Sequence, residues 1–483
     1  MKQLSGIDAS FLYMETPETP MHVAAFNIFE LPEGLEGSFH EHFTKFFKSR
    51  VHLVSIFNQK LAKSILELDH PGWVDAGPID FGHHIQSAKL PAPGTFEQLE
   101  EMVADLHSVP LDLKKPLWQF TVIEGLKDNQ AVIYSKVHHA LVDGGAGMEI
   151  TQALFDLGPI PREVKPPETR KKKRVPTKAE RAILGMHDLA TNVVRQNLAA
   201  LEAVPQAMVQ MAGVAASAAA GNLGLPQVMA PKTPFNRTIG QKRSYCARTV
   251  SLSDVKAIGK QTGTKVNDVV MAICSGALRQ YLDEKHILPD ASLMAFIPIS
   301  TRASGNSGSN NQVFGMNSPL ATNYSDPLKR LKKVHAETGA SKTLAGSVQD
   351  LSPKDFTLLG APTVLPALMN MYGKSGLANI LPNAVNVTIS NTAGPPFPMY
   401  CAGAKVLALY PVSIPIHGVG LNLTVQSYLD RLDFGLTADH GSVPDIGHLG
   451  DLLVDSFEEL RNVVLGPPPK SSAKAKRPKK TGK

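Results

Sequence analysis

The first third of the chain alternates between strand-like and helix-like hydrophobic patterns. Residues Met21–Leu31, Trp118–Leu126 and Gln130–Val137 are rich in β-branched and aromatic side chains, and we predict a strand for each. Between the first two, Phe39–Leu66 is predicted to form helical stretches, and a further helix is expected after the last strand. This mixture predicts one α/β unit over residues 1–158.

A second α/β unit is predicted over residues 241–465. Its signals are a long helix with apolar residues on one side, a buried strand, a hairpin whose strands alternate cleanly, and a final amphipathic helix. These elements are expected at Val266–Tyr281, at Leu293–Ile299, at Leu421–Val425 with Leu432–Leu436, and from Pro444 to Val464. The predicted fold class is therefore α/β, with helices layered on sheets in both units.

The segment between the units, residues 159–240, differs in composition. It begins with prolines and a basic run, Arg170–Arg174, and no charged residue lies between Glu202 and Lys232. Prolines and glutamines interrupt this apolar stretch, which argues against a helix that spans a bilayer. Two interpretations stay open. The stretch is either an interfacial helix whose basic run meets anionic head groups, or a connecting helix packed on the protein.

Composition and charge restrict the function classes. A hydrophobic fraction of 43% and a charged fraction of 19% are typical of a globular protein with sizeable cores. The net charge of +6 is concentrated in residues 466–483, a Pro- and Lys-rich tail that we expect to be disordered, so no nucleic-acid partner is indicated. Three widely spaced cysteines give no zinc pattern, and the N-terminus lacks a signal-peptide pattern, so we expect a cytoplasmic location.

The candidate chemistry lies where the strand Gln130–Val137 gives way to a glycine-containing turn. His138 and His139 are followed by Asp143 and Gly144. A neutral imidazole can accept a proton from a hydroxyl near neutral pH. Adjacent residues of a strand point to opposite faces, so one histidine is expected to face a substrate. Asp143 could orient the imidazole or pair with an arginine, and a structural turn around a buried histidine is the competing interpretation.

Several motifs in a fixed order resemble those of one enzyme family. From Lys2 to about Val464 the chain looks like a bacterial wax ester synthase/diacylglycerol acyltransferase. The motifs that carry this resemblance are Leu4 to Leu12, Glu15 to Val23, Pro116-Leu117-Trp118, His138 to Gly144 (the HHxxxDG signature of CoA-dependent acyltransferases), Asn267-Asp268, Asn391 to Pro395, and Tyr410 to Ser413. Several separate motifs in order are far more specific than the histidine motif alone.

The resemblance implies two chloramphenicol-acetyltransferase-like domains with a tunnel at their interface. It implies that His139 is the general base, that His138 shapes the site, and that Asp143 is structural and pairs with an arginine of the other domain, for which Arg302 is the candidate. An alcohol becomes nucleophilic once its proton is accepted, and a thiolate is a good leaving group. We therefore expect direct transfer without an acyl-enzyme, and no metal or organic cofactor.

The other motifs supply further candidate residues on strands and helices. Asn267 is a candidate for oxyanion stabilisation or acceptor positioning, because a side-chain amide donates without titrating. An N-cap of a helix that begins at Asp268 is an equally consistent interpretation. Ser390 and Asn391, at a strand end, are candidates to contact pantetheine or the oxyanion, or are ordinary turn residues.

The resemblance also places two motifs near the channel. These are Glu15 and the sequence Pro116, Leu117 and Trp118. Their residue types alone favour a blander interpretation, in which Trp118 is a core aromatic and Glu15 is a surface carboxylate.

Together these features predict an acyl-CoA:alcohol O-acyltransferase. It would make wax esters from long-chain fatty alcohols, triacylglycerol from diacylglycerol, or both, with acyl-CoA as a substrate and not a cofactor. We expect the protein on the cytoplasmic side, peripherally attached to the inner membrane or to lipid inclusions. Two other hypotheses stay open: a condensation-type acyltransferase that uses carrier-protein thioesters, and a non-catalytic lipid-droplet protein that binds membrane through Arg170–Arg174.

Overall fold

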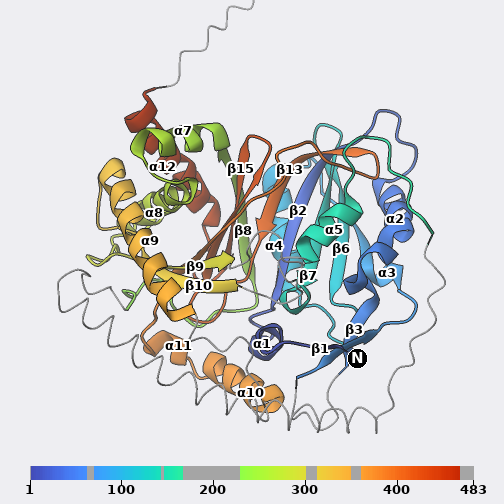
Figure 1. Ribbon diagram of the computed structural model, residues 1–483, viewed down its shortest axis with the longest axis horizontal. Coiled ribbons are helices and arrows are strands. Elements are labelled where there is room, and N and C mark those ends of the chain that lie inside the picture. Colours follow the sequence, from blue (N-terminus) through green and yellow to red (C-terminus); the bar gives the residue numbers. More distant parts are fainter. Residues whose placement is uncertain are drawn as a thin grey trace, which may run out of the picture.

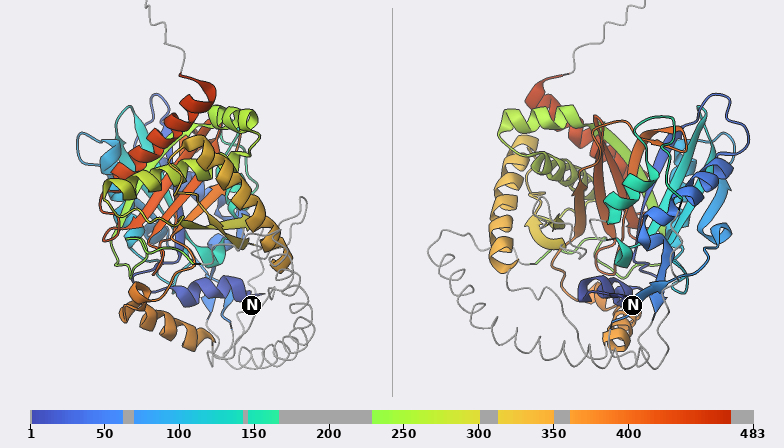
Figure 2. Two further views of the ribbon diagram at one scale, coloured as in Figure 1. Left: turned by 90° about the vertical axis from the view of Figure 1, so that its left-hand side faces the viewer. Right: turned by 45° about the vertical axis from the view of Figure 1, so that its right-hand side comes forward.

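The computed structural model describes residues 2–62, 70–142, 146–166, 229–300, 313–349 and 361–467. Within these ranges the chain forms two six-stranded mixed sheets and one three-stranded sheet. Each large sheet belongs to its own α/β unit, and the two units stand side by side (Figure 1). The two units are also seen next to each other in the right-hand view of Figure 2.

The N-terminal sheet has the strand order β12-β13-β2-β7-β6-β5. Its strands are β2 (His22–Glu30), β5 (Ile85–Lys89), β6 (Trp118–Leu126), β7 (Gln130–His138), β12 (Tyr400–Cys401) and β13 (Ala404–Val412). Helices α2 (Phe39–Arg50), α3 (Phe81–His84) and α5 (Ala146–Leu154) cover one face, and α4 (Phe96–Ser108) covers the other (Figure 1). Aromatic side chains fill the space between α2 and the sheet, where Phe43, Phe47, Phe57, Trp118 and Phe120 are buried.

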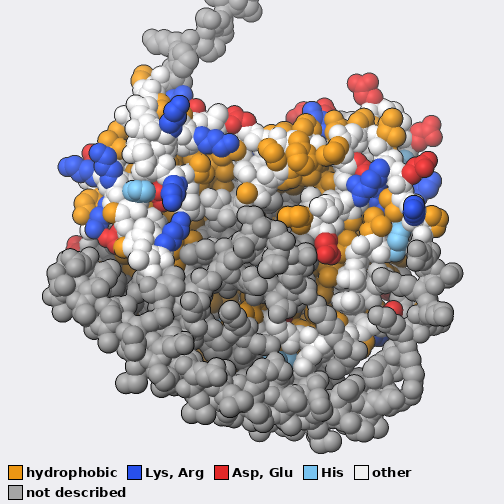
Figure 3. Space-filling view, viewed as in Figure 1, with side chains coloured by type: hydrophobic (Ala, Val, Ile, Leu, Met, Phe, Trp, Pro, Cys, Tyr) orange, Lys and Arg blue, Asp and Glu red, His pale blue; other side chains and the backbone are white. Residues whose placement is uncertain are grey.

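The C-terminal sheet has the order β10-β9-β11-β14-β15-β8. Its strands are β8 (Arg243–Ser251), β9 (Met294–Ser300), β10 (Val313–Pro319), β11 (Val387–Thr392), β14 (Leu421–Tyr428) and β15 (Arg431–Asp439). The helices on its outer face are α7 (Leu252–Thr262), α8 (Val266–Glu284), α9 (Pro327–Gln349) and α12 (Ile446–Leu465). Basic side chains gather over these helices, at the left of Figure 3.

Two strands from the C-terminal half complete the N-terminal sheet. Strand β13 pairs antiparallel with β2, from Lys405 opposite Glu30 to Val412 opposite Ala24. The Tyr245 hydroxyl of β8 donates to the backbone carbonyl of Pro411 in β13 at 3.0 Å. Backbone pairing and side-chain contacts therefore join the two units, and β2 and β7 lie close to their junction.

Smaller elements from both halves lie together below the two units (Figures 1 and 2). Helix α1 (Gly6–Met14) precedes the motif that contains Glu15, and α10 (Ala361–Lys374) and α11 (Leu377–Ile380) follow in the C-terminal half. Helices α1 and α10 are in contact. The three-stranded sheet has the order β1-β4-β3, with β1 at Lys2–Gln3, β3 at Gln59–Ala62 and β4 at Gly72–Asp75.

Most of the predicted elements are present, with one correction. The predicted strand Trp118–Leu126 has the predicted bounds, and the predicted hairpin is formed by β14 and β15. The helical prediction for Phe39–Leu66 is wrong at Gln59–Ala62, which forms β3 after two short 3₁₀ helices, η1 (Val51–Leu53) and η2 (Ser55–Asn58). Pairing with β4 decides this short segment, whose local pattern fits either state.

The segments proposed for lipid contact are not part of this description. The basic run Arg170–Arg174, the apolar stretch after Glu202 and nearly all of the basic tail lie outside the described residues. Within the described ranges, the helices are too short or too polar to cross a membrane.

Candidate active site

The histidine pair sits at the end of a central strand. His138 is the last residue of β7 and stands opposite His22 of β2, and η3 (His139–Leu141) begins directly after it. The His138 N–H donates to the Leu117 carbonyl at 2.9 Å, and the His139 N–H donates to the Met21 carbonyl at 2.8 Å. Backbone hydrogen bonds from the motifs that contain Leu117 and Met21 therefore fix the backbone of the histidine pair.

His138 is buried and has both ring nitrogens engaged. Its Nδ1 accepts from the Ala140 N–H at 3.1 Å, so the ring proton resides on Nε2. Nε2 lies 3.3 Å from Oε2 of Glu15, and Oε1 of Glu15 accepts from the Met21 N–H at 3.4 Å. The Glu15 side chain is only 10% exposed, so its interpretation as a surface carboxylate is wrong.

His139 has a different environment. Its ring stacks on Phe11 of α1, with ring centroids 3.9 Å apart and planes at 18°. The pKa of His139 is lowered to about 4, chiefly by burial and also by the neighbouring His138, while its own backbone carbonyl acts in the opposite direction. Nδ1 of this ring is buried and has no hydrogen-bond partner among the described residues. A neutral imidazole is therefore available at this position near neutral pH.

Asp143, Gly144 and Arg302 lie outside the described residues. The expected pairing between the aspartate and the arginine, and the role of the glycine, stay predictions.

The Pro116-Leu117-Trp118 motif packs next to the end of β7, where the histidine pair lies. Leu117 and Trp118 are fully buried, and the indole Nε1–H of Trp118 donates to the Phe57 carbonyl at 3.1 Å. The indole also stacks on His84 with centroids 4.2 Å apart. Trp118 thus packs in the aromatic core, in agreement with the interpretation of this residue as a core aromatic.

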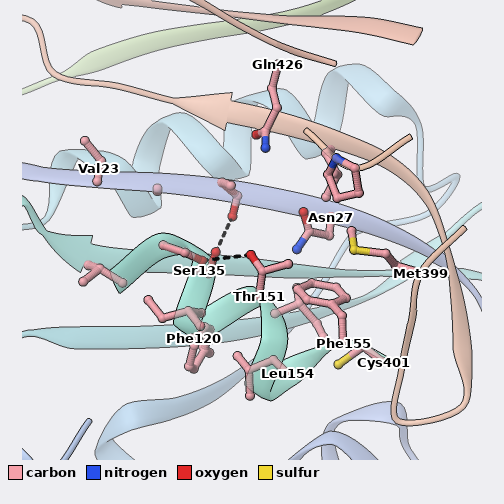
Figure 4. Close-up of a pocket in the computed structure, with 18 of the residues that line it drawn as sticks. Val23, Asn27, Phe120, Ser135, Thr151, Leu154, Phe155, Met399, Cys401 and Gln426 are labelled. Atoms are coloured by element: carbon pink, nitrogen blue, oxygen red, sulfur yellow. Dashed lines mark hydrogen bonds between the residues drawn. The ribbon is translucent and has the colours of Figure 1, made fainter. Parts of the chain in front are cut away.

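An apolar cavity of about 360 Å³ lies between the sheet and helix α5. Its walls come from β2, β7 and α5, and further lining residues come from the segment before β12 and from β14, which contributes Gln426 (Figure 4). Val137 and Val142, which flank the histidine pair, line it, and Phe43 and Phe120 line it elsewhere. Most of its lining residues lie outside the sequence motifs named above, so the cavity could not be predicted from them.

A second set of candidate residues meets in the C-terminal unit. Helix α8 begins at Val266 with Lys265 as its N-cap, so Asn267 lies in the first turn and the N-cap interpretation is wrong. The Asn391 side-chain amide donates to Oδ1 of Asn267 at 3.4 Å. Ser390 is half-buried beside Asn391 at the end of β11. The structure therefore brings two of the predicted motifs together.

Asp268, the neighbour of Asn267, has a structural role that sequence reasoning missed. Its carboxylate accepts from the Lys265 N–H at 2.9 Å and from the Thr338 hydroxyl at 2.9 Å, and it lies 2.6 Å from Nδ1 of His335. Asp268 thereby ties the start of α8 to α9. In the described part of the chain, no group of three or more His, Cys, Asp or Glu side chains is placed to hold a metal ion.

The chain has two α/β units with mixed sheets, the N-terminal sheet is completed by two strands of the C-terminal half, and a histidine pair lies at the end of a central strand. These features define a condensation-domain-like fold. The chain matches the first condensation domain of the calcium-dependent antibiotic synthetase with a TM-score of 0.53, over 96% of this chain and 97% of that one. The sequence identity is 9%, so this likeness concerns the fold alone.

Comparison with family models places the chain in a class more specific than the fold. The model of the wax ester synthase/diacylglycerol acyltransferase catalytic domain matches residues 4–270, and that of the WS/DGAT C-terminal domain matches residues 309–461. The chain belongs to the wax ester synthase/diacylglycerol acyltransferase family.

Relatives and a solved structure agree with this placement. A Mycobacterium tuberculosis protein named as a candidate diacylglycerol O-acyltransferase is 34% identical over 463 residues, which cover 95% of this chain and 100% of the relative. An O-acyltransferase of Acinetobacter baylyi is 31% identical, with 96% and 98% covered. The solved wax ester synthase/diacylglycerol acyltransferase of Marinobacter aquaeolei has a TM-score of 0.69 at 28% identity, over 96% of this chain and 100% of that one.

Proposed function

We propose that the chain is an acyl-CoA:alcohol O-acyltransferase in which His139 is the general base. The observation that carries the proposal is the contrast within the histidine pair. Both ring nitrogens of His138 are engaged, whereas the ring of His139 has a low pKa and a free nitrogen. A base that is neutral at cellular pH and held by stacking is suited to accept a hydroxyl proton.

The reaction then follows from the two substrates. A ring nitrogen of His139 accepts the proton of the acceptor hydroxyl as its oxygen attacks the thioester carbonyl. The tetrahedral intermediate collapses with cleavage of the C–S bond, and the CoA thiolate takes the proton back from His139. No bond between protein and acyl group is required, since the thiolate is a good leaving group and the alcohol attacks directly.

We assign oxyanion stabilisation or acceptor positioning to Asn267. Its Oδ1 accepts from Asn391, which leaves its own amide N–H groups free to donate to a substrate oxygen. Ser390 is proposed to contact the pantetheine arm from the same strand end.

The acceptor is proposed to be a long-chain fatty alcohol, diacylglycerol, or both. Support comes from the apolar cavity beside the histidine pair, which is suited to an alkyl chain, and from the names of the relatives. Because such substrates partition into lipid, we also propose peripheral attachment to the inner membrane or to lipid inclusions. Flotation of the full-length protein with anionic and neutral vesicles tests that attachment.

Thiol release from palmitoyl-CoA tests the function. The wild-type protein is assayed with hexadecanol, with 1,2-dioleoylglycerol, and with no acceptor, and the esters are identified by mass spectrometry. We expect release that depends on the acceptor, with matching amounts of ester. No acceptor-dependent release would refute the proposal, and transfer only from an acyl carrier protein would favour a condensation-type reaction instead.

A further inference from the structure

One asparagine of the N-terminal sheet lies between apolar register partners. Asn27 lies in β2, between Ile133 of β7 and Leu409 of β13, which are its register partners. It is 8% exposed, and its Oδ1 has no hydrogen-bond partner among the described residues. Buried amides are normally hydrogen-bonded, and leaving one unpaired destabilises the fold. Packing alone would favour an aliphatic residue here, so the amide calls for another explanation.

The amide of Asn27 faces the cavity beside α5. Figure 4 shows Asn27 on the cavity wall, with Ser135 and Thr151 on neighbouring elements. The hydroxyls of Ser135 and Thr151 already donate to the backbone carbonyls of Ala25 and Gly147, at 3.0 and 2.9 Å. Both hydroxyl oxygens can therefore only accept from a ligand, whereas the amide of Asn27 can both donate and accept. A ligand hydroxyl can donate one hydrogen bond to these acceptor oxygens and accept another from the amide of Asn27.

The position of Asn27 along the strand indicates where on a chain that hydroxyl would lie. Asn27 is five residues beyond His22, the register partner of His138. At ~3.4 Å per residue the separation is about 17 Å. An extended chain advances roughly 1.2 Å per bond, because three backbone bonds span at most ~3.6 Å. A chain atom beside Asn27 is then about 14 bonds from the reacting carbonyl. The amides of the pantetheine arm lie closer to the thioester sulfur than this, so they do not reach Asn27.

We propose that this cavity selects an alkyl chain that carries a hydroxyl group in its distal half, and that Asn27 is the residue that binds this hydroxyl. The inference rests on the proposed function, because it places the chain of an acyl or alcohol substrate in the cavity. The hydroxylated chain can belong to the acyl donor or to the acceptor alcohol. A purely aliphatic chain would leave the amide of Asn27 buried without a partner, which makes it the poorer ligand.

The test compares matched donors on the wild type and on Asn27→Leu. The donors are octadecanoyl-CoA, 12-hydroxyoctadecanoyl-CoA and 2-hydroxyoctadecanoyl-CoA, with hexadecanol as acceptor. We expect the wild type to favour the 12-hydroxy donor over the plain donor at least tenfold in kcat/KM. Asn27→Leu should lower this ratio at least tenfold and leave the 2-hydroxy ratio unchanged. Asn323→Leu, at an exposed position, is the control for the substitution itself.

The acceptor arm uses 1,12-octadecanediol against octadecanol, and the same change of ratio there would assign the hydroxylated chain to the alcohol. Unchanged ratios in both arms for a folded Asn27→Leu protein would overturn the proposal. Asn27→Leu could also lower kcat/KM equally with all CoA donors but not with an S-acyl ethanethiol, which lacks pantetheine. That result would assign Asn27 to the pantetheine arm and would also overturn the proposal. Asn27→Val provides a smaller variant if the leucine side chain prevents folding.

Binding separates this inference from the proposed function. Calorimetric titration of 12-hydroxyoctadecanoic and octadecanoic acid into the wild type and Asn27→Leu needs no turnover. If the wild type transfers no acyl group but binds the hydroxy acid more tightly in an Asn27-dependent manner, the proposed reaction fails and the cavity assignment stands. If the wild type transfers acyl groups but does not distinguish hydroxylated from plain chains, the proposed function stands and the cavity assignment fails.

Discussion

Replacing Glu15 by alanine is expected to impair acyl transfer through the orientation of His138. Oε2 of Glu15 lies 3.3 Å from Nε2 of His138, whose side chain is 0% exposed. A hydrogen bond to a charged group contributes ~1.5–3 kcal/mol, and the substitution would leave a buried N–H unpaired. His138 also accepts from Ala140 in η3, which carries His139. We therefore expect kcat/KM to fall roughly ten- to hundredfold, since ~1.4 kcal/mol corresponds to a factor of ten.

The conservative variant Glu15→Gln keeps an acceptor oxygen without the charge, so it should recover most of that loss. The assay is hexadecanol-dependent thiol release from palmitoyl-CoA, with thermal unfolding measured on the same samples. Glu33→Gln, in the exposed segment after β2, makes the same chemical change away from the site and should have no effect. Wild-type kinetics for Glu15→Ala would refute the reasoning, as would an equal loss in both Glu15 variants.

Three further predictions concern the same site. Because burial lowers the pKa of His139 to about 4, its neutral form should persist from pH 8 down to about 5, and kcat/KM should fall only as the pH drops towards 4; a loss centred near 6.5 would contradict this. Phe11→Ala removes the ring stacked at 3.9 Å on His139, and since an aromatic pair contributes ~0.5–1.5 kcal/mol, kcat should fall roughly two- to twelvefold, less so for Phe11→Tyr. Trp118→Phe deletes the indole donor to the Phe57 carbonyl, so denaturant unfolding should show a loss of ~1–3 kcal/mol with little change in KM; a raised KM at unchanged stability would instead make Trp118 a channel residue.

Elements with a strong local pattern could be predicted from the sequence. Trp118–Leu126 is a strand with the predicted bounds, because its β-branched and aromatic residues are buried on both faces of a strand that has a neighbour on each side. The position of the histidine pair at the end of β7 was predicted for the same reason. The separate roles of the two histidines were implied by the resemblance, and the hydrogen bonds of His138 now give a physical argument for them.

Contacts between distant segments could not be predicted. β13 has an ordinary strand pattern, and nothing in it indicates that it pairs with β2 and not with the sheet of its own half. Glu15 and His138 are 123 residues apart, so the residue type of Glu15 alone suggested the surface. Gln59–Ala62 is too short for its hydrophobic pattern to distinguish a strand from a helix. Asn27 is recognised as a candidate only from the structure, which shows that its Oδ1 is buried without a partner among the described residues.

The activity of His139→Ala and His139→Gln tests the central claim most directly. Alcohol-dependent thiol release from palmitoyl-CoA is measured for both variants and the wild type, with thermal unfolding as the control for folding. Since a positioned general base contributes ~10²–10⁴-fold, both variants should lose at least a hundredfold in kcat while they remain folded. Activity close to that of the wild type in either folded variant would contradict the assignment of His139 as the base.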